Sequence, residues 1–370
     1  MVLSSPADLL CAVPYLVGFH PADSLVVAGF TGGPPDGRLR LTTRWDLPLV
    51  PGALDLLVPL LTREGVTQVM AAGFGSGALV TPAMDEAIRL LREAGITVAE
   101  ALRAEGGRYW SYLCRDVRCC PPEGVPYDTG SSAIAAQATV HGMVALPDRH
   151  SLEISLTPVD GPGRASMRRA TARAVAEFRR RLAEAERPDE FAAEFVAAGL
   201  ARVRDAVRVH LAGGRLGDDE AARLGLDLAV IRVRDEAWIL IDDDTIGAHL
   251  ELWRDLTRRL EPRFTAPAAS LLGAAAWRNG ECALAGIAVE RALSADPGYT
   301  MARLLLEGLR SLVSPGILRS GMPTAEDLDE QMGRPTIAWL DPLRALIDGT
   351  EPLRPVPGRE KDACPRSGPT

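Results

Sequence analysis

The sequence has almost no lysine. Lys361 is the only one, and the other 40 of its 41 basic residues are arginine. Together with abundant alanine, glycine and proline, this bias is typical of a GC-rich genome, so arginine clusters carry less functional meaning than usual. The net charge of −8 at pH 7 disfavours non-specific binding to nucleic acid or to anionic lipid. We therefore interpret Arg168–Arg169 and Arg179–Arg181 as solvated helix surface and expect no nucleic-acid partner.

Long apolar runs are also missing. No stretch of eighteen uncharged apolar residues occurs, which predicts no membrane-spanning helix and no membrane partner. The apolar run from Leu9 to Phe19 contains Pro14 and Gly18, and no cationic segment precedes it, so we expect no secretory signal. These absences favour a cytoplasmic protein, in which disulfides are uncommon.

The composition that remains is that of a globular protein. The chain has 370 residues, 47% apolar and 24% charged, which is long enough for two or three domains. Its first part mixes helices and strands. Strands are predicted over Ser24–Phe30, Arg38–Trp45, Val66–Phe74 and Ile96–Leu102 and near Ser151–Leu156, and helices from Ser5 to Gly18, from Thr81 to Gly95 and over 132–141. A strand, a capped helix and a strand in succession indicate a βαβ unit with parallel strands.

The pattern changes near Thr157–Gly163. Long amphipathic helices are predicted over 164–186 and 188–212, and further helices follow to about residue 348. The sequence thus predicts an α/β N-terminal domain over 1–158, with a mixed sheet and at least one βαβ unit, and an all-α C-terminal domain over 159–348. The many prolines that follow predict a disordered tail over 349–370.

One helical stretch, 266–299, resembles a single tetratricopeptide repeat. Small residues and the turn fall where that motif has them, at Leu272-Gly273, Ala276, Gly280, Ala285, Ala292-Leu293 and Asp296-Pro297. The stretch departs from the motif at Ala269, where an aromatic residue is usual. Small residues let two antiparallel helices approach closely, and a single repeat needs neighbours to cover its apolar face.

Four stretches that together span most of the chain resemble one family. They are Ala12–Val27, Thr42–Pro48, Gly107–Gly124 and Ala275–Tyr299. On these residues the sequence resembles the actinobacterial domain-of-unknown-function family 4192. That family has no assigned activity, so the resemblance implies membership without a function.

Three cysteines, Cys114, Cys119 and Cys120, lie close together beside a Pro-Pro turn. Structural zinc usually takes four ligands in pairs spaced by two to four residues, whereas the spacing here is C-x4-C-C and no adjacent histidine supplies a fourth ligand. We therefore predict no metal, and a catalytic thiolate lacks an adjacent base. Two interpretations stay open: a loop in which the cysteines pack as small apolar residues, and a redox-sensitive pair in which Cys114 joins Cys119 or Cys120 on oxidation.

Two groups of residues are candidate ligand contacts. Arg108, Trp110 and Tyr112 share one face of the strand before the cysteines and form a candidate ligand wall; the alternative is an ordinary aromatic cross-strand cluster. Arg44 and Asp46 close the strand predicted over 38–45, and open α/β sheets bind ligands at strand ends. The alternative for this pair is a local ion pair of little energetic value.

Two further motifs are weaker. Gly73–Gly77 follows a strand, as a dinucleotide-binding loop does, but its G-x-G-x-G spacing, the late helix start at Thr81 and the lack of a following acidic residue do not fit. We therefore expect no cofactor. His20 and Asp23 are a candidate acid–base pair, and a turn stabilised by Asp23 is the favoured interpretation.

No complete set of catalytic residues emerges, whereas the helical part contains a motif of the partner-binding kind. We therefore predict a cytoplasmic binding or adaptor protein with a protein or peptide partner on its helical domain. The alternative is an enzyme or a thiol-based redox sensor whose site is the strand and loop Arg108–Gly124.

Overall fold

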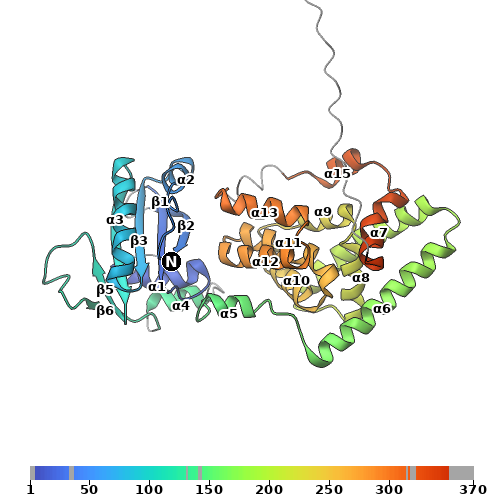
Figure 1. The fold of residues 1–370 in the computed structure, drawn as a ribbon, viewed down its shortest axis with the longest axis horizontal. Helices are drawn as coiled ribbons and strands as arrows, with labels where there is room; N and C mark the ends of the chain where they lie inside the picture. Colours follow the sequence, from blue (N-terminus) through green and yellow to red (C-terminus); the bar gives the residue numbers. More distant parts are fainter. Residues whose placement is uncertain are drawn as a thin grey trace, which may run out of the picture.

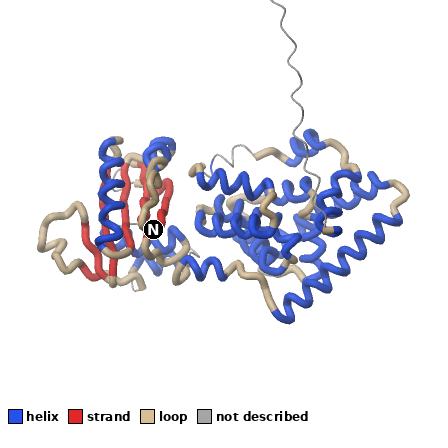
Figure 2. The backbone as a smooth tube through the Cα atoms, in the orientation of Figure 1, coloured by secondary structure: helices blue, strands red, loops and turns tan. Residues whose placement is uncertain are grey.

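The computed structural model describes residues 5–32, 37–130, 132–140, 144–313, 316 and 322–349. One part is a six-stranded sheet with helices on both faces, and the other is built of helices (Figures 1 and 2). The predicted fold class, α/β followed by all-α, is confirmed. The predicted tail over 349–370 lies outside the described residues except for Gly349. None of the described helices is long and apolar enough to cross a membrane.

The sheet is mixed, with strand order β2-β1-β3-β4-β5-β6. Its strands are β1 (Ser24–Thr31), β2 (Arg38–Asp46), β3 (Gln68–Phe74), β4 (Thr97–Glu105), β5 (Arg108–Ser111) and β6 (Val125–Pro126). β3 and β4 pair in parallel and are joined by α3 (Gly77–Glu93), which confirms the predicted βαβ unit. The other neighbouring strands pair antiparallel. The two edges differ in length, because β2 has nine residues and β6 has two.

Apolar side chains alternate along the central strands and fill a layer on each face of the sheet. Those that face α2 (Leu57–Arg63) and α3 include Leu25, Val27, Val69, Ala71 and Ala101. Those that face α1 (Pro6–Val17) include Val26, Ala72, Leu102 and Ala104. Helices thus cover both faces, and the long edge at β2 is the part of the sheet that remains for further contacts.

The first helix begins as its sequence predicts. Ser5 Oγ accepts a hydrogen bond from the Asp8 N–H at 3.2 Å, and the Asp8 carboxylate accepts one from the Ser5 N–H at 2.9 Å. This reciprocal pair is a capping box. Helix α4 (Ala133–Val140), which comes after β6 in the chain, packs beside α1.

Two predicted elements are wrong. The helix expected from Thr81 begins at Gly77 and includes Pro82 in its second turn, so the proline that suggested a first helical turn does not mark it. The strand expected near Ser151–Leu156 is instead the helix α5 (Arg149–Ile154). The Asp148 carboxylate accepts a hydrogen bond from the Ser151 N–H at 2.6 Å, and this N-cap favours a helix over the strand that the alternating side chains suggest.

The helical part starts with two long helices, α6 (Gly161–Glu184) and α7 (Pro188–Leu211), close to their predicted bounds. The others are α8 (Asp218–Asp227), α9 (Ile231–Ile239), α10 (Ile246–Arg259), α11 (Pro262–Arg278), α12 (Cys282–Ala295), α13 (Thr300–Arg310), α15 (Ala325–Met332), the 3₁₀ helix η1 (Ile337–Leu340) and α16 (Asp341–Asp348). Their common core also includes Leu152 and Leu156. Buried contacts therefore cross residue 158, and the domain limits 1–158 and 159–348 stay predictions.

Helices α11 and α12 form a closely packed hairpin. It turns at 279–281, where Gly280 has a φ of +83°. A Cβ atom at Gly273 would lie 2.8 Å from Val289 Cγ2, so the absence of a side chain lets the two helices approach. The hairpin is present, and its likeness to a tetratricopeptide repeat stays a prediction.

Replacement of Ala285 by leucine is expected to destabilise the protein by about 1–3 kcal/mol. Ala285 is fully buried in the hairpin, so three added carbons have to displace packed neighbours. Gly286→Ala is the matched control, because a Cβ there meets no atom within 4 Å. Urea denaturation followed by circular dichroism measures both, and equal midpoints for Ala285→Leu and wild type would contradict the expected packing.

Candidate functional site

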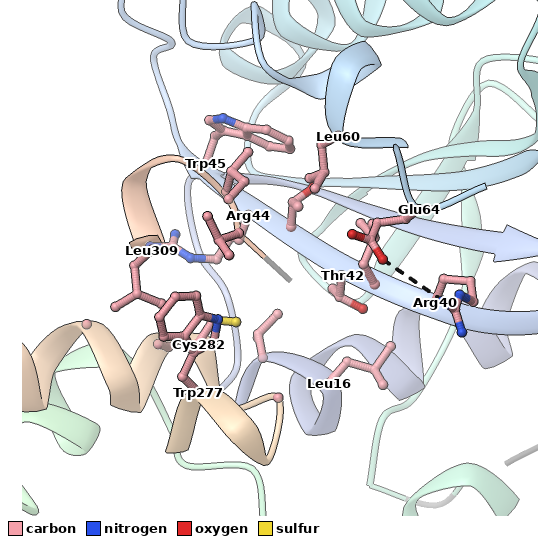
Figure 3. A pocket seen from close by; sticks show the side chains of 18 of the residues that line it. Leu16, Arg40, Thr42, Arg44, Trp45, Leu60, Glu64, Trp277, Cys282 and Leu309 are labelled. Carbon is pink, nitrogen blue, oxygen red and sulfur yellow. Dashed lines mark ion pairs between the residues drawn. The ribbon is translucent and has the colours of Figure 1, made fainter. Parts of the chain in front are cut away.

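A cavity of about 320 Å³ lies between the sheet and the helical hairpin (Figure 3). Strand β2, the end of α1 and part of α2 form one wall, and α11, α12, α13 and the residues after α13 form the other. Junctions between packed units are common places for ligand binding, and this volume is in the usual range. The two walls come from segments more than 200 residues apart in the chain.

Strand β2 meets the cavity with its outer edge. Six consecutive residues, Arg40–Trp45, line the cavity. Successive side chains of a strand point to opposite faces of its sheet, so a cavity against one face would be lined by every second residue. The unbroken run places the cavity at the edge, with Thr42 and Arg44 opposite Trp277 and Leu309 (Figure 3).

The backbone of β2 directs hydrogen-bonding groups toward the cavity. The Leu47 N–H donates to the Asp23 carbonyl at 2.7 Å, which sets the phase of pairing with β1. In an antiparallel pair every second residue turns its N–H and C=O to the partner strand. Leu47 and every second residue before it, Thr43 included, therefore direct their N–H and C=O groups to β1. The N–H and C=O groups of Thr42 and Arg44 point away from β1. Within the described part of the chain, no hydrogen bond outside the β1–β2 ladder reaches the backbone groups of Thr42 or Arg44.

The lining is positively charged, although the protein has a net charge of −8. Three arginines and one glutamate line it. Arg40 lies 4.0 Å from Glu64, as the dashed line in Figure 3 marks. Arg149 pairs with a glutamate of its own helix at 2.9 Å. The residues predicted as a ligand-binding pair, Arg44 and Asp46, form an ion pair of 2.7 Å, and Arg44 lines the cavity while Asp46 is exposed.

The helical wall is apolar. Trp277 is 3% exposed, and its ring packs on α13, where a Cβ at Gly308 would lie 2.5 Å from Trp277 Cη2. Leu309 and Gly286 continue the wall. Sequence reasoning missed this wall, although Trp277, which directly follows the small residue Ala276 of the repeat-like stretch, was a local signal for it.

A second candidate site is the cysteine loop, which we define as residues 112–124. The Sγ atoms of Cys114, Cys119 and Cys120 all lie within 4.8 Å of one another, and all three cysteines are free. A turn at Asp116 gathers them, because its carbonyl accepts from the N–H groups of Cys119 at 3.0 Å and Cys120 at 2.7 Å. Ser111 Oγ accepts from the Cys114 N–H at 3.1 Å.

The thiols of the cluster differ in acidity. A hydrogen bond from the backbone of Asp116 is the main cause that lowers the pKa of Cys114, and a hydrogen bond with Cys120 adds to it. Burial is the main cause that raises the pKa of Cys120 to about 12, with hydrogen bonds to the other two thiols as further causes. Cys114 therefore forms a thiolate more readily than Cys120 does.

Two of the three residues predicted as a ligand wall hold the cysteine loop. Arg108 Nη1 donates to the Gly124 carbonyl at 2.8 Å, and Trp110 Nε1 donates to the Pro122 carbonyl at 2.9 Å. The Arg103 guanidinium stacks over the Trp110 ring, 3.8 Å from its centre, a cation–π contact. These contacts assign both side chains to fixing the end of the loop.

Tyr112 lies apart from that pair. Its hydroxyl is 2.8 Å from Thr81 Oγ1 of α3, and burial is the main cause that raises its pKa. The structure therefore brings Arg108 and Trp110 together at the loop and places Tyr112 against a helix. A ligand wall made of all three stays a prediction.

Replacement of Gly124 by alanine is expected to destabilise the protein by about 1–3 kcal/mol. Its φ is +81°, and a Cβ there would lie 2.6 Å from Trp110 Cε2. Gly95→Ala is the matched control, because Gly95 has a φ of +73° and open space around its Cβ. Both variants place a side chain at a positive φ, but only Gly124→Ala also meets the Trp110 ring, so thermal denaturation of the two separates these costs. Equal losses of stability would show that the Trp110 ring moves aside without cost.

The remaining motifs serve packing. A Cβ at Gly73 would lie 2.1 Å from Val80 Cγ1, so this glycine lets α3 approach β3. Gly75 has a φ of +134°, and a Cβ there would lie 3.0 Å from Asp23 Oδ1. The His20 N–H donates to the Leu146 carbonyl at 2.9 Å, which ties its loop to the segment before α5.

A comparison with protein families gives one match. The family described as a domain of unknown function, DUF4192, matches residues 6–316. The chain belongs to the DUF4192 family. No curated protein and no solved structure matches it at a significant level.

The DUF4192 match includes both candidate sites. It contains the cysteine loop and the full lining of the cavity, which runs from Leu16 to Val313. It ends before α15 and α16. The cavity and the cysteine loop are therefore parts of the DUF4192 region itself, whereas the last helices of the chain are not.

Proposed function

We propose that this protein is a cytoplasmic binding protein that takes up an extended segment of a partner polypeptide along β2. The observation that carries the proposal is the unbroken run Arg40–Trp45 along the cavity. An extended peptide that adds a strand to an open sheet edge gains main-chain hydrogen bonds, and its alternate side chains enter pockets. The helical hairpin supplies the pockets, in keeping with a peptide partner on the helical part.

The contrast between the two sheet edges supports β2 as the receiving strand. β6 has two residues, one of them Pro126, which has no N–H to donate. β2 has nine residues, and the outward groups of Thr42 and Arg44 are the donors and acceptors that a partner strand needs. A peptide bound along β2 would take the place of water at backbone groups that already have strand geometry.

Charge favours an acidic segment. Arg40, Arg44 and Arg149 line the cavity with one carboxylate, that of Glu64, while the partners of Arg44 and Arg149, Asp46 and Glu153, lie outside the lining. A cationic recess on an acidic protein attracts anionic groups and disfavours basic ones. The apolar wall at Trp277 and Leu309 fits an apolar side chain between acidic positions, so we expect a segment that alternates acidic and apolar residues.

Selection from a phage-displayed library of random peptides on the full chain tests the proposal. Enriched peptides are expected to alternate acidic and apolar residues. Synthetic copies are then titrated by fluorescence anisotropy. Thr42→Pro removes the outward N–H, and we expect it to weaken binding about tenfold. Thr42→Ala is the matched control, because it keeps the N–H and removes only the side chain.

Charge is tested in the same assay. Arg44→Gln is expected to weaken binding and reduce its salt dependence, whereas Arg89→Gln, whose partner is the exposed Glu93, is expected to leave both unchanged. Equal binding by Thr42→Pro and Thr42→Ala would exclude strand addition. Selection that enriches no peptide, with a small molecule retained in native mass spectrometry, would assign the cavity to a small ligand instead.

A further inference from the structure

The cysteine loop contains a cluster that the peptide-binding proposal does not use. Cys114, Cys119 and Cys120 place three sulfur atoms within 4.8 Å of one another. Among the described residues, no other group of three cysteines, histidines or carboxylates comes this close. Soft thiolate ligands gathered in this way select soft or borderline metal ions.

We propose that these three cysteines bind one Zn²⁺ ion through three thiolates. Zn–S bonds of about 2.3 Å in tetrahedral geometry place sulfur atoms about 3.8 Å apart. Because the three sulfur atoms already lie within 4.8 Å of one another, each separation has to shorten by about 1 Å at most. The C-x4-C-C spacing departs from that of structural zinc sites, but the turn at Asp116 brings Cys119 and Cys120 close to Cys114 in spite of it.

The loop is held in place without a metal. The backbone N–H groups of all three cysteines are hydrogen bonded, those of Cys119 and Cys120 to Asp116 and that of Cys114 to Ser111. Outside the cluster, the Trp110 indole and the Arg108 guanidinium fix the far end of the loop. Little ordering is then required on binding, so metal uptake and folding of the whole chain are separate events.

The fourth coordination position is open. The carboxylate of Asp116, at the turn that gathers the cysteines, is bound by the Arg118 guanidinium at 3.0 and 3.2 Å. Cys119 is exposed, so solvent reaches the cluster and a water molecule or a thiol from outside completes the tetrahedron. Three protein ligands with one open position is the arrangement of zinc sites that exchange ligands.

Zinc binding by the three cysteines requires no oxidant or reductant. Three thiols release three protons to solvent as three Zn–S bonds form, so zinc affinity falls as the pH is lowered. Disulfide formation would instead join two of the sulfur atoms, would require an oxidant and would leave the third thiol unused. A cluster of three convergent thiols fits one metal ion better than it fits one disulfide.

Cobalt substitution tests the site. The untagged full chain is reduced, stripped with a chelator and titrated with Co²⁺. One equivalent is expected to produce the intense near-ultraviolet thiolate-to-cobalt absorption and the visible bands of tetrahedral Co²⁺, and Zn²⁺ is expected to abolish both. Cys114→Ser, Cys119→Ser and Cys120→Ser are each expected to weaken binding by more than about 100-fold, since loss of outer partners alone costs about 10–100-fold. Cys282→Ser, which removes an exposed thiol elsewhere, is the matched control.

Alkylation gives a readout that needs no variant. With Zn²⁺ present, the folded chain is expected to show three fewer reactive thiols than without it, and peptide mapping is expected to assign them to Cys114, Cys119 and Cys120. Absence of tetrahedral Co²⁺ bands, or bands that survive the three substitutions, would overturn the proposal. Protection of two thiols that is reversed by a reductant and not by a chelator would show a disulfide instead.

Discussion

Replacement of Glu236 by leucine is expected to destabilise the protein by about 3–5 kcal/mol. Glu236 and Arg232 are 1% and 2% exposed and form an ion pair of 2.9 Å on α9. Removal of the carboxylate leaves the buried Arg232 guanidinium with Asp329, at 2.8 Å, as its one ion-pair partner among the described residues. Arg204 also pairs with Glu236 and loses its partner. Urea denaturation followed by circular dichroism measures the loss.

Two matched variants isolate the cause. Asp329→Asn removes an exposed partner of the same arginine, and its effect is expected to be the smaller, because water replaces that carboxylate. The double variant Arg232→Met, Glu236→Leu is expected to regain much of the stability, because an apolar pair of similar volume replaces the buried charges. A Glu236→Leu variant as stable as wild type would show that water reaches Arg232.

The second large effect is on the pH dependence of stability. Burial of His249 in α10 is the main cause that lowers its pKa from 6.5 to about 4. The unfolded chain therefore binds a proton near pH 6.5 that the folded chain does not bind until about pH 4. The contribution of His249 to the unfolding free energy is therefore constant well above pH 6.5. It falls by about 3 kcal/mol as the pH drops from 6.5 to 4.

His249→Gln removes this proton from the comparison. The unfolding free energy of the wild type minus that of the variant is expected to fall by about 3 kcal/mol as the pH is lowered from 7 to 4. Carboxylates far from His249 titrate alike in both proteins and cancel in the difference, whereas Asp242, whose charge interacts with His249, contributes to it. The Trp253 indole donates to His249 Nδ1 at 3.2 Å, and a glutamine oxygen is a suitable acceptor in its place. Parallel stability curves across this range would contradict the expected linkage.

Local signals were sufficient for most of the fold. The capping box at Ser5, the alternation in Arg38–Trp45 and the order strand, helix, strand around α3 depend on neighbouring residues, and the structure confirms all three. The errors arose where two local signals compete. At 151–156 the alternating side chains suggested a strand, whereas one hydrogen bond from Ser151 to Asp148 starts a helix.

The candidate sites depend on distance in the fold. Arg44 was predicted as a ligand contact from its place at a strand end, but its opposite wall, with Trp277 and Leu309, comes from helices that no local pattern links to β2. The cysteines were visible as a group. Their convergence was not, because it follows from the turn at Asp116, whose carbonyl takes two N–H groups.

The long edge of β2 has a consequence for synthesis of the chain. About 230 residues separate Asp46 from Trp277, so β2 emerges from the ribosome roughly 10–45 s before Trp277 of the hairpin that faces it, at about 5–20 residues per second. During that interval an open nine-residue strand is able to pair with another nascent chain, the first step of aggregation. Arg38, Arg40 and Arg44 put positive charge on the edge, and like charges on two such edges repel. Arg40 and Arg44, which line the cavity of the finished protein, thereby help to keep unfinished copies of it apart.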